Sequence, residues 1–254
     1  MTTFFARLFR TSGSGSDRAA QDARPAGNAD APGRDFSLYS GERQIAGRYE
    51  DIRLDHRNRY EWALQFLPKH GTGMDIFCGN GYGTRRLAED EEGAVARTVL
   101  GIDASAEAIA FAKTHYAAPG VTFRVGVYPF DIPVGWFDFV VSLESIEHIE
   151  PDARFFADLA HSLLPGGVFV FSVPCETHLP LRFANREFHF RHYEHDAILQ
   201  LIAENGLEVI GWAGQNTYVL DENGIVELLP DEDCFLAPET LAQFVVFAAR
   251  KPTS

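Results

Sequence analysis

Between residues 55 and 204, short apolar runs alternate with longer segments whose apolar residues recur every three or four positions. The short runs predict buried strands, and the periodic segments predict helices. The predicted strands cover residues 73–78, 98–102, 121–125, 137–142 and 168–173, and the predicted helices cover residues 55–67, 82–89, 104–116, 152–164 and 194–204. Because strands joined by helices return to one sheet in the same direction, this alternation predicts a mostly parallel sheet with helices on both faces.

The C-terminal part of the chain breaks this alternation. Two further strands are predicted at residues 207–212 and 243–249, with no helix between them. Strands that follow one another without a crossover helix can pair antiparallel. We therefore expect an α/β fold with a doubly wound, seven-stranded sheet, mostly parallel, with one antiparallel strand near the C-terminus.

The N-terminal part differs from the rest in composition. Residues 11–35 are rich in Gly, Ser, Ala, Pro and Asp and contain hardly any apolar side chains. Such a segment buries too little surface to offset its loss of conformational entropy on ordering. Residues 1–38 are therefore predicted to form a disordered tail, and residues 39–254 a single domain.

Charge and cysteine content limit the expected partners and compartment. The chain has 36 acidic and 22 basic side chains, a formal net charge of −14, which repels nucleic acid. Cys78, Cys175 and Cys234 are far apart in the sequence and form no C-x-x-C pair, which favours a reducing, cytoplasmic location. No apolar run approaches the roughly 20 residues of a membrane helix, so stable membrane insertion is not expected.

A glycine-rich turn follows the first predicted strand, in the sequence MDIFCGNGYGT from Met74 to Thr84. A turn between a strand and a helix presents backbone N–H groups and the positive helix end to a ligand. Asp103, at the end of the second predicted strand, is placed to accept hydrogen bonds from the hydroxyls of a ribose. A dinucleotide site would need a third glycine at position 84, which is Thr, so an NAD-type oxidoreductase is disfavoured.

The turn resembles the D/E-x-G-x-G-x-G motif of class I methyltransferases that use S-adenosylmethionine, of the type 11 and type 23 kind. FDFVVSLESIEHI (137–149) and LLPGGVFVFSVP (163–174) are similar to the fourth-strand segment and to a helix-to-strand turn of that family. Residues 41–63, 185–206 and 214–215 resemble a subgroup often found among methyltransferases that modify sugars and surface glycans. The resemblance implies a Rossmann-like fold, S-adenosylmethionine as cofactor, and in-line O-methylation of a small molecule or a sugar or glycan precursor.

The resemblance also implies a set of cofactor-binding residues. These are Tyr60, Asp75, Cys78, Gly79, Asn80, Gly81, Tyr82, Asp103, Ala104, Val127, Tyr128 and Leu143. His56, Arg59 and Tyr60 on the first predicted helix are expected either to close over the cofactor or only to cover the sheet edge.

Two positions depart from the family pattern. Phe77 replaces a small residue, and Val127 stands where an Asp commonly bonds the adenine amino group. The ring of Phe77 would clash with the cofactor if it pointed into the site, and would merely pack if it turned under the first helix. The departures leave open a catalytically inactive partner protein with the same fold.

The candidate catalytic residues are Glu144, Glu147 and His148, which follow the fourth predicted strand. If this segment begins a helix, the three side chains share one face. His148 is then the expected general base, and its alternative role is a structural histidine bonded to a backbone carbonyl. His189 and His192 are expected at the mouth of the substrate site.

The same residues raise the question of a metal. Glu144-x-x-Glu147-His148, with a later His189 or His192, resembles a pattern of ubiquinone-pathway O-methyltransferases and small-RNA 3′-end methyltransferases. Carboxylates and imidazoles can hold Mg²⁺ or Mn²⁺. The spacing selects neither histidine, and the Glu-His pair is also common in metal-free relatives. The sequence therefore favours a metal-free site.

Overall fold

A computed structural model of the chain describes residues 43–184 and 188–253. The predicted disordered tail, residues 1–38, and the predicted start of the domain at residue 39 lie outside the described residues. Within the described part, no helix has the length and apolar character needed to span a lipid bilayer.

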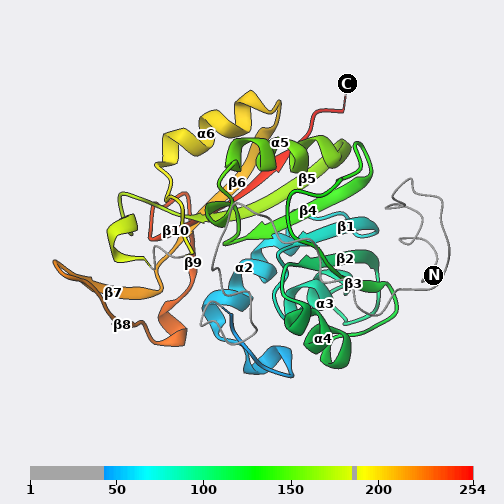
Figure 1. The fold of residues 1–254 in the computed structure, drawn as a ribbon, viewed down its shortest axis with the longest axis horizontal. Helices are drawn as coiled ribbons and strands as arrows, with labels where there is room; N and C mark the ends of the chain where they lie inside the picture. The colour runs from blue at the N-terminus through cyan, green and yellow to red at the C-terminus, as the bar shows by residue number, and fades with distance from the viewer. Residues whose placement is uncertain (1–42, 185–187, 254) are drawn as a thin grey trace.

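Helices pack on both faces of a large sheet (Figure 1). The helices are α2 (Leu54–Leu64), α3 (Tyr82–Ala88), α4 (Ala106–His115), α5 (Asp152–Ser162) and α6 (His195–Glu204), and short 3₁₀ turns include η2 (Ile146–His148). The strands are β1 (Gly71–Ile76), β2 (Arg97–Asp103), β3 (Val121–Val125), β4 (Phe137–Leu143), β5 (Leu163–Pro174), β6 (Glu208–Gln215), β7 (Tyr218–Asp221), β8 (Gly224–Leu228), β9 (Leu236–Pro238) and β10 (Phe244–Arg250).

The main sheet has the order β3-β2-β1-β4-β5-β10-β6-β9. Strands β1 to β5 run parallel, and β10 is antiparallel to both β5 and β6. This confirms the predicted mostly parallel sheet with an antiparallel closing strand.

The predicted number of seven strands is wrong, because β9 adds an eighth at the edge, antiparallel to β6. β9 is only three residues long and ends at Pro238. Proline lacks a backbone donor and is tolerated at an edge strand, so this short segment carries almost no strand signal in the sequence. The separate β7–β8 hairpin was also absent from the prediction.

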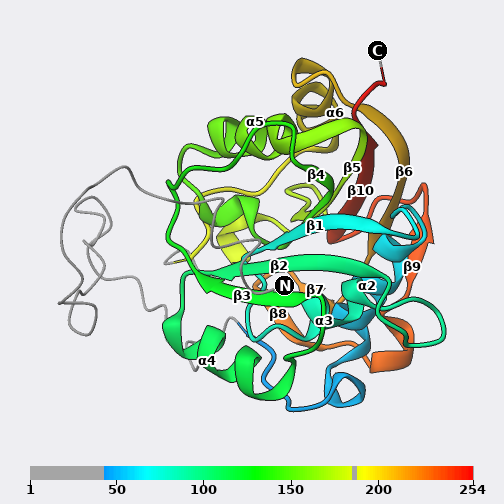
Figure 2. The same cartoon turned by 90° about the vertical axis from the view of Figure 1, so that its right-hand side faces the viewer.

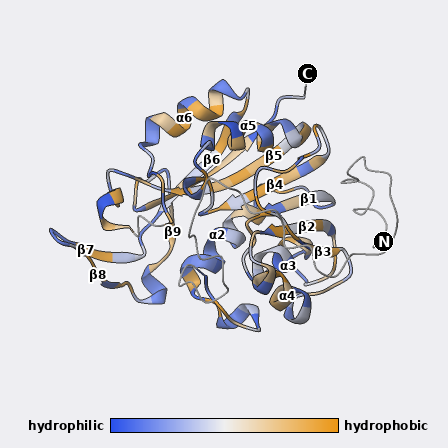
Figure 3. Cartoon of the chain, in the orientation of Figure 1, coloured by the Kyte–Doolittle hydropathy of each residue, from blue (hydrophilic) through white to orange (hydrophobic). Residues whose placement is uncertain are grey.

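Two apolar cores lie on the two faces of the sheet. The helices on both sides of the sheet are seen in Figure 2, and the hydropathy of each residue is shown in Figure 3. Helices α5 and α6 cover one face, and α2, α3 and α4 cover the other. In β4, Val140 packs into the first core, whereas Phe139 and Val141 pack into the second. The unbroken apolar run of this strand therefore follows from burial on both faces.

The boundary between α5 and β5 differs from the prediction. The sequence predicts a helix over residues 152–164 that Pro165 and the following glycines terminate, but α5 ends at Ser162. Leu163 is already extended and fully buried, and it pairs with Phe137. The Pro-Gly-Gly segment thus lies inside β5, where the pairing with β4 is irregular. The strand begins before this segment because Leu163 is buried in an extended conformation.

The strand order places a ligand site. β1 lies between β2 and β4, so the chain leaves β1 toward one side of the sheet and returns on the other. In doubly wound sheets, ligands bind at this switch point, outside the carboxyl ends of the strands. Asp75 of β1 pairs with Val141 of β4, so the glycine-rich turn and the segment after β4 leave the sheet side by side.

Candidate functional site

The three glycines of the turn after β1 have different roles. Gly79 (φ +56°) and Gly81 (φ +89°) adopt the left-handed conformation that favours glycine. A Cβ on Gly81 would lie 2.6 Å from the Cβ of Ala112, and one on Gly83 would lie 1.9 Å from the ring of Tyr60. These two glycines allow close packing within the protein, whereas a Cβ on Gly79 would meet no atom within 4 Å. Gly79 therefore borders open space that a ligand can approach.

Asp103 connects this turn to the end of β2. Its carboxylate accepts hydrogen bonds from the backbone N–H of Gly79 (2.9 Å) and of Ser105 (2.8 Å). Nη2 of Arg43 lies 3.1 Å from the same carboxylate. The residue expected to bind the ribose is thus fixed beside Gly79, but an arginine that the sequence reasoning missed shares it.

Residues 43–47, which we call the strap, lie over the glycine-rich turn. In addition to the Arg43 contact, the Asn80 amide donates to the carbonyl of Gln44 (2.6 Å), and the Tyr116 hydroxyl donates to the carbonyl of Ala46 (2.6 Å). The side chain of Asn80 is buried by this contact and holds the strap. No local sequence pattern predicts these pairs, because they join segments far apart in the chain.

Phe77 packs away from the open side of the turn. Its backbone has φ +58°, a left-handed conformation that a non-glycine residue adopts only with strain. Its half-buried ring stacks on Phe155 of α5, with ring centroids 5.5 Å apart. The expectation of ordinary aromatic packing is therefore met under α5 and not under the first helix.

We predict that Phe77→Gly leaves the affinity for S-adenosylhomocysteine within about threefold of the original. The substitution relieves a left-handed strain of about 1–2 kcal/mol, but it also removes a ring stacked on the core. The free energy of unfolding should therefore fall by only about 1 kcal/mol. Calorimetry and urea unfolding check both values, and a large gain in affinity would show that the ring obstructs the site.

Asp75 lies in a buried polar group behind the turn. Its carboxylate accepts hydrogen bonds from the hydroxyls of Thr84 (2.6 Å) and Tyr60 (3.4 Å). Burial raises the pKa of Asp75 to about 7, although these two hydrogen bonds act in the opposite direction. Tyr82 packs edge-on against Tyr60 (5.6 Å between centroids), and its hydroxyl lies 3.3 Å from Nδ1 of His56. Tyr60 of α2, Asp75 of β1 and Tyr82 of α3 thus lie close together behind the glycine-rich turn.

The raised pKa of Asp75 makes stability depend on pH. The folded protein keeps this carboxyl protonated up to about pH 7, whereas the unfolded chain ionises it near its ordinary value of 3.8. The protonated Asp75 carboxyl therefore contributes to folding stability at low pH, and this contribution is lost as the pH rises toward 7. Between pH 5.5 and 7 the loss is about 2 kcal/mol at about 1.4 kcal/mol per pH unit. Asp75→Asn should remove this part of the pH dependence of the free energy of unfolding, measured with urea. If the free energies of unfolding of the two proteins change equally with pH, the prediction is wrong.

The other residues expected to bind the cofactor differ in which groups they expose. The Tyr128 hydroxyl donates to Asp158 (2.7 Å), and its ring packs on Phe155, so this side chain points into the core. Cys78 is a buried thiol near Gly101. Val127 and Leu143 are half-buried, and Ala104 lies between Asp103 and the first residue of the α4 cap.

Arg59 extends toward β6 and β10, at the same end of the sheet as the C-terminal residue of β5. Its Nε donates to the Gln215 side chain (2.7 Å), and its guanidinium lies 4.5 Å from the ring centroid of Phe244. Gln215 is fully buried and also donates to the carbonyls of Asp55 and Cys234. Arg59 therefore anchors α2 to β6 and β10, and its contact with Gln215 was not predicted from the sequence.

Glu144 does not begin a helix, and this corrects the sequence prediction. Its φ is +49°, and its backbone N–H donates to Oγ of Ser172 (3.0 Å) on β5. Burial raises the pKa of the Glu144 carboxyl, and the positive charge of Arg59 opposes this shift. Because Glu144 is left-handed and only the short turn η2 follows, no helix face carries the three side chains, and Glu144 lies outside the group formed by Glu147, His148 and His189.

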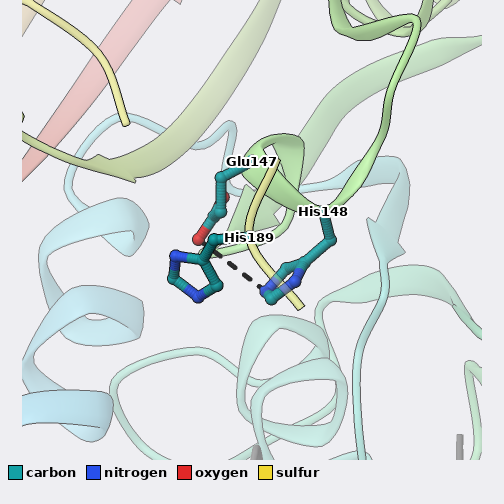
Figure 4. Close-up of side chains that lie close together, drawn as sticks. All are labelled: Glu147, His148 and His189. Carbon is teal, nitrogen blue, oxygen red and sulfur yellow. Dashed lines mark ion pairs between the residues drawn. The ribbon is translucent and has the colours of Figure 1, made fainter. Parts of the chain in front are cut away.

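Glu147 and His148 meet His189 from a second segment of the chain (Figure 4). Glu147 is fully buried, and its Oε1 lies 3.9 Å from Nε2 of His148. The rings of His148 and His189 pack edge to face, with centroids 4.7 Å apart. Among the described residues, this is the one group of three His, Cys, Asp or Glu side chains whose ligand atoms all lie within 4.8 Å of one another.

Backbone contacts hold the two segments together. Nδ1 of His148 lies 2.9 Å from the carbonyl of Phe188, and the N–H of Phe190 donates to the carbonyl of Glu147 (2.9 Å). Nδ1 of His189 lies 2.8 Å from Nε2 of His192, whose Nδ1 lies 2.5 Å from the carbonyl of Leu179. His189 therefore reaches the site, and His192 lies behind it.

Comparison with known proteins gives consistent matches. A family described as a methyltransferase domain matches residues 74–171, from β1 into β5. A probable S-adenosylmethionine-dependent methyltransferase from Mycolicibacterium smegmatis is 32% identical over 176 residues, or 67% of this chain and 65% of that protein. A ubiquinone biosynthesis O-methyltransferase from Sinorhizobium fredii is 34% identical over 98 residues, or 37% of this chain and 38% of that protein. The chain thus spans just under two thirds of the length of the mycolicibacterial relative.

Solved structures share the fold. A methyltransferase from Mesorhizobium loti that depends on S-adenosylmethionine superposes with a TM-score of 0.56 at 20% identity, over 76% of this chain and 98% of that chain. The [4+2]-cyclase SpnF superposes with a TM-score of 0.55 at 16% identity, over 79% of this chain and 81% of that chain. At these identities the likeness shows the fold alone, and the cyclase illustrates that one fold serves different reactions.

Proposed function

The chain belongs to the class I S-adenosylmethionine-dependent methyltransferases, and from this premise we propose that it methylates a hydroxyl group of a small molecule or glycan precursor. The observation that carries the proposal is the placement of Asp103 and Gly79 at the switch point of the sheet. The segment that holds Glu147 and His148 leaves the sheet beside them. A cofactor site and an acid–base group thus belong to neighbouring strand ends.

The residues of the turn fit S-adenosylmethionine. The carboxylate of Asp103 is the acceptor that the ribose hydroxyls require, and the open space at Gly79 permits close approach to the backbone. Val127 supplies no carboxylate for the adenine amino group, so the adenine must be held by backbone groups and packing. When bound, the cofactor supplies a methyl group that its sulfonium charge already activates. The main task of the protein is then to hold the acceptor in line with it.

The acceptor is proposed to be a hydroxyl because Glu147, His148 and His189 suit its activation. Nε2 of His148 can accept a hydroxyl proton as a general base, and the group can alternatively hold a cation that lowers the hydroxyl pKa. Methyl transfer would depend on His148 in either case, as general base or as ligand of the cation. The S. fredii relative, an O-methyltransferase by name, supports transfer to oxygen.

A binding experiment followed by an activity panel tests the proposal. Calorimetry should show that the protein binds S-adenosylmethionine and S-adenosylhomocysteine but not NAD. Methyl transfer from labelled S-adenosylmethionine is then measured with phenolic, quinol and nucleotide-sugar acceptors. A protein that binds neither cofactor form would be the catalytically inactive partner that the departures at Phe77 and Val127 left open.

Arg43 is predicted to compete with the cofactor for Asp103. A carboxylate has about four acceptor positions, and Gly79, Ser105 and Arg43 already occupy three of them. Two ribose hydroxyls therefore require Arg43 to move. Arg43→Ala should tighten S-adenosylhomocysteine binding about two- to fivefold, because a partly exposed ion pair contributes up to about 1 kcal/mol.

Arg48 provides the matched control for this prediction. It forms an exposed ion pair with Asp51 (2.7 Å) outside the turn, so Arg48→Ala should leave the affinity unchanged. Calorimetry on both variants measures the difference. Weaker binding by the Arg43 variant alone would mean that the arginine supports the cofactor site.

A cytoplasmic location is part of the proposal. Cys78, Cys175 and Cys234 are all buried free thiols in the structure. Unpaired cysteines of this kind are typical of reducing compartments. This supports the cytoplasmic location expected from the sequence.

A further inference from the structure

We propose that Glu147, His148 and His189 bind one divalent metal ion of the zinc, manganese or cobalt class. The inference deepens the proposed function, since the ion would occupy the position at which the acceptor hydroxyl is activated. The binding itself is a property of these three side chains and can be measured without any methyl transfer.

The donor atoms come from two segments that are held firmly together. Glu147 and His148 lie on η2, and His189 lies on the loop before α6. Two hydrogen bonds join the segments, one from the Phe190 N–H to the Glu147 carbonyl and one between Nδ1 of His148 and the Phe188 carbonyl. Figure 4 shows the three side chains turned toward one another. A site assembled from two fixed segments is preorganised for a ligand.

The contact with Phe188 determines which nitrogen of His148 faces Glu147. A carbonyl oxygen only accepts, so Nδ1 of His148 carries the hydrogen in this contact. In a neutral ring, Nε2 then carries the lone pair, and this atom lies 3.9 Å from Oε1 of Glu147. A nitrogen lone pair and a carboxylate oxygen thus face each other at a distance that a metal ion can bridge.

A chain of two contacts determines the state of His189 in the same way. The carbonyl of Leu179 only accepts, so Nδ1 of His192 carries the hydrogen in that contact, and its Nε2 can accept from Nδ1 of His189. Nε2 of a neutral His189 then carries the lone pair. Metal-binding histidines typically donate their second ring N–H to a backbone carbonyl or another acceptor, which fixes the tautomer. Both His148 and His189 show this arrangement.

The donor set selects the class of ion. Two imidazoles and one carboxylate suit zinc, manganese, iron or cobalt, whereas calcium and magnesium prefer all-oxygen sites. Bonds of about 2.1 Å to a tetrahedral ion place the ligand atoms about 3.4 Å apart. The atoms here lie within 4.8 Å, so small side-chain rotations close the site. Three protein ligands leave a position for water or a hydroxyl, as in catalytic sites.

The structure thus resolves the ambiguity of the metal pattern in the sequence. It selects His189 over His192 as the ligand and leaves Glu144 outside the group. The sequence favours a metal-free site because the spacing selects neither histidine and the Glu-His pair is common in metal-free relatives; the grouping of Glu147, His148 and His189 is the observation that favours a metal here.

The test uses the full chain with any affinity tag removed, because histidine tags bind the same ions. The protein is freed of metal with a chelator, and Zn²⁺ and Mn²⁺ are titrated by calorimetry. Elemental analysis and the visible spectrum of the Co²⁺ form report the stoichiometry and the nitrogen ligands. One ion per chain is expected, with affinity about 100-fold weaker in Glu147→Gln and in His189→Ala. His192→Ala should weaken binding about tenfold, as for other groups that orient a ligand.

Two controls keep the result interpretable. His161 is an exposed histidine on α5, so His161→Ala should bind the ion like the unaltered protein. S-adenosylhomocysteine affinity, measured on every variant, shows whether the fold and the cofactor site are intact. A protein that binds S-adenosylhomocysteine but no ion overturns the metal site and leaves the proposed function with His148 as base. Equal ion affinity in all variants also overturns it.

Discussion

Asp103→Ala is expected to weaken binding of S-adenosylhomocysteine by about 100- to 10,000-fold. A carboxylate that binds two ribose hydroxyls contributes about 1.5–3 kcal/mol per hydrogen bond, and each 1.4 kcal/mol corresponds to a factor of ten. The same carboxylate also accepts the N–H groups of Gly79 and Ser105, so the variant loses a contact that shapes the turn. Calorimetry at fixed pH and salt measures the affinity, and urea unfolding measures the accompanying loss of stability.

Asp138 supplies the control for this experiment. It also accepts a backbone hydrogen bond, from Thr72 (2.7 Å), but at the start of β1 and away from the switch point. Asp138→Ala should reduce stability and leave the affinity unchanged. If Asp103→Ala binds the ligand within threefold of the original, the assignment of this carboxylate to the ribose is wrong.

The part of the site formed by β1, the glycine turn and β2 could be predicted because local sequence determines it. The left-handed backbone at positions 79 and 81 favours glycine. Asp103 is the last residue of β2, the strand that pairs with β1. Each of these features follows from residue type and spacing within one β-α-β unit. The sequence therefore predicts the glycine-rich turn and Asp103 at the carboxyl end of the sheet, where Asp103 accepts a hydrogen bond from Gly79.

The segment after β4 could not be predicted in the same way, because distant residues determine it. Glu144 lies outside the group of Glu147, His148 and His189, because Ser172 on β5 holds its backbone N–H in a left-handed turn. A helix would have been equally compatible with the local residues. Arg43 was missed for a similar reason, as its partner Asp103 is 60 residues away.

The choice between the two candidate histidines also depended on tertiary structure. His189 and His192 are three residues apart, and nothing in their spacing distinguishes them. The carbonyl of Leu179, on the segment after β5, holds His192 and thereby directs His189 toward Glu147. The short strand β9 and the β7–β8 hairpin likewise carry weak signals, since few of their residues are buried.

His148→Ala is expected to lower kcat by about 100- to 10,000-fold, the range that general acid–base groups contribute. The affinity for S-adenosylhomocysteine should change less than threefold, because the ribose and turn contacts lie on β1 and β2. Loss of kcat without loss of cofactor affinity separates activation of the acceptor from cofactor binding. The measurement is the methyl transfer rate at saturating cofactor, with whichever acceptor the panel identifies.

His178→Ala is the matched control, because His178 is exposed on the connection between β5 and α6, which also carries His189. Its rate should equal that of the unaltered protein. Nδ1 of His148 donates to the carbonyl of Phe188, so only Nε2 can accept a proton or bind an ion. His148→Gln keeps a polar group of similar length but offers neither an imidazole base nor an imidazole ligand, so it should be about as slow as the alanine variant. If either variant retains a third of the original rate, the acceptor is activated elsewhere, and Glu144 near Arg59 becomes the residue to replace next.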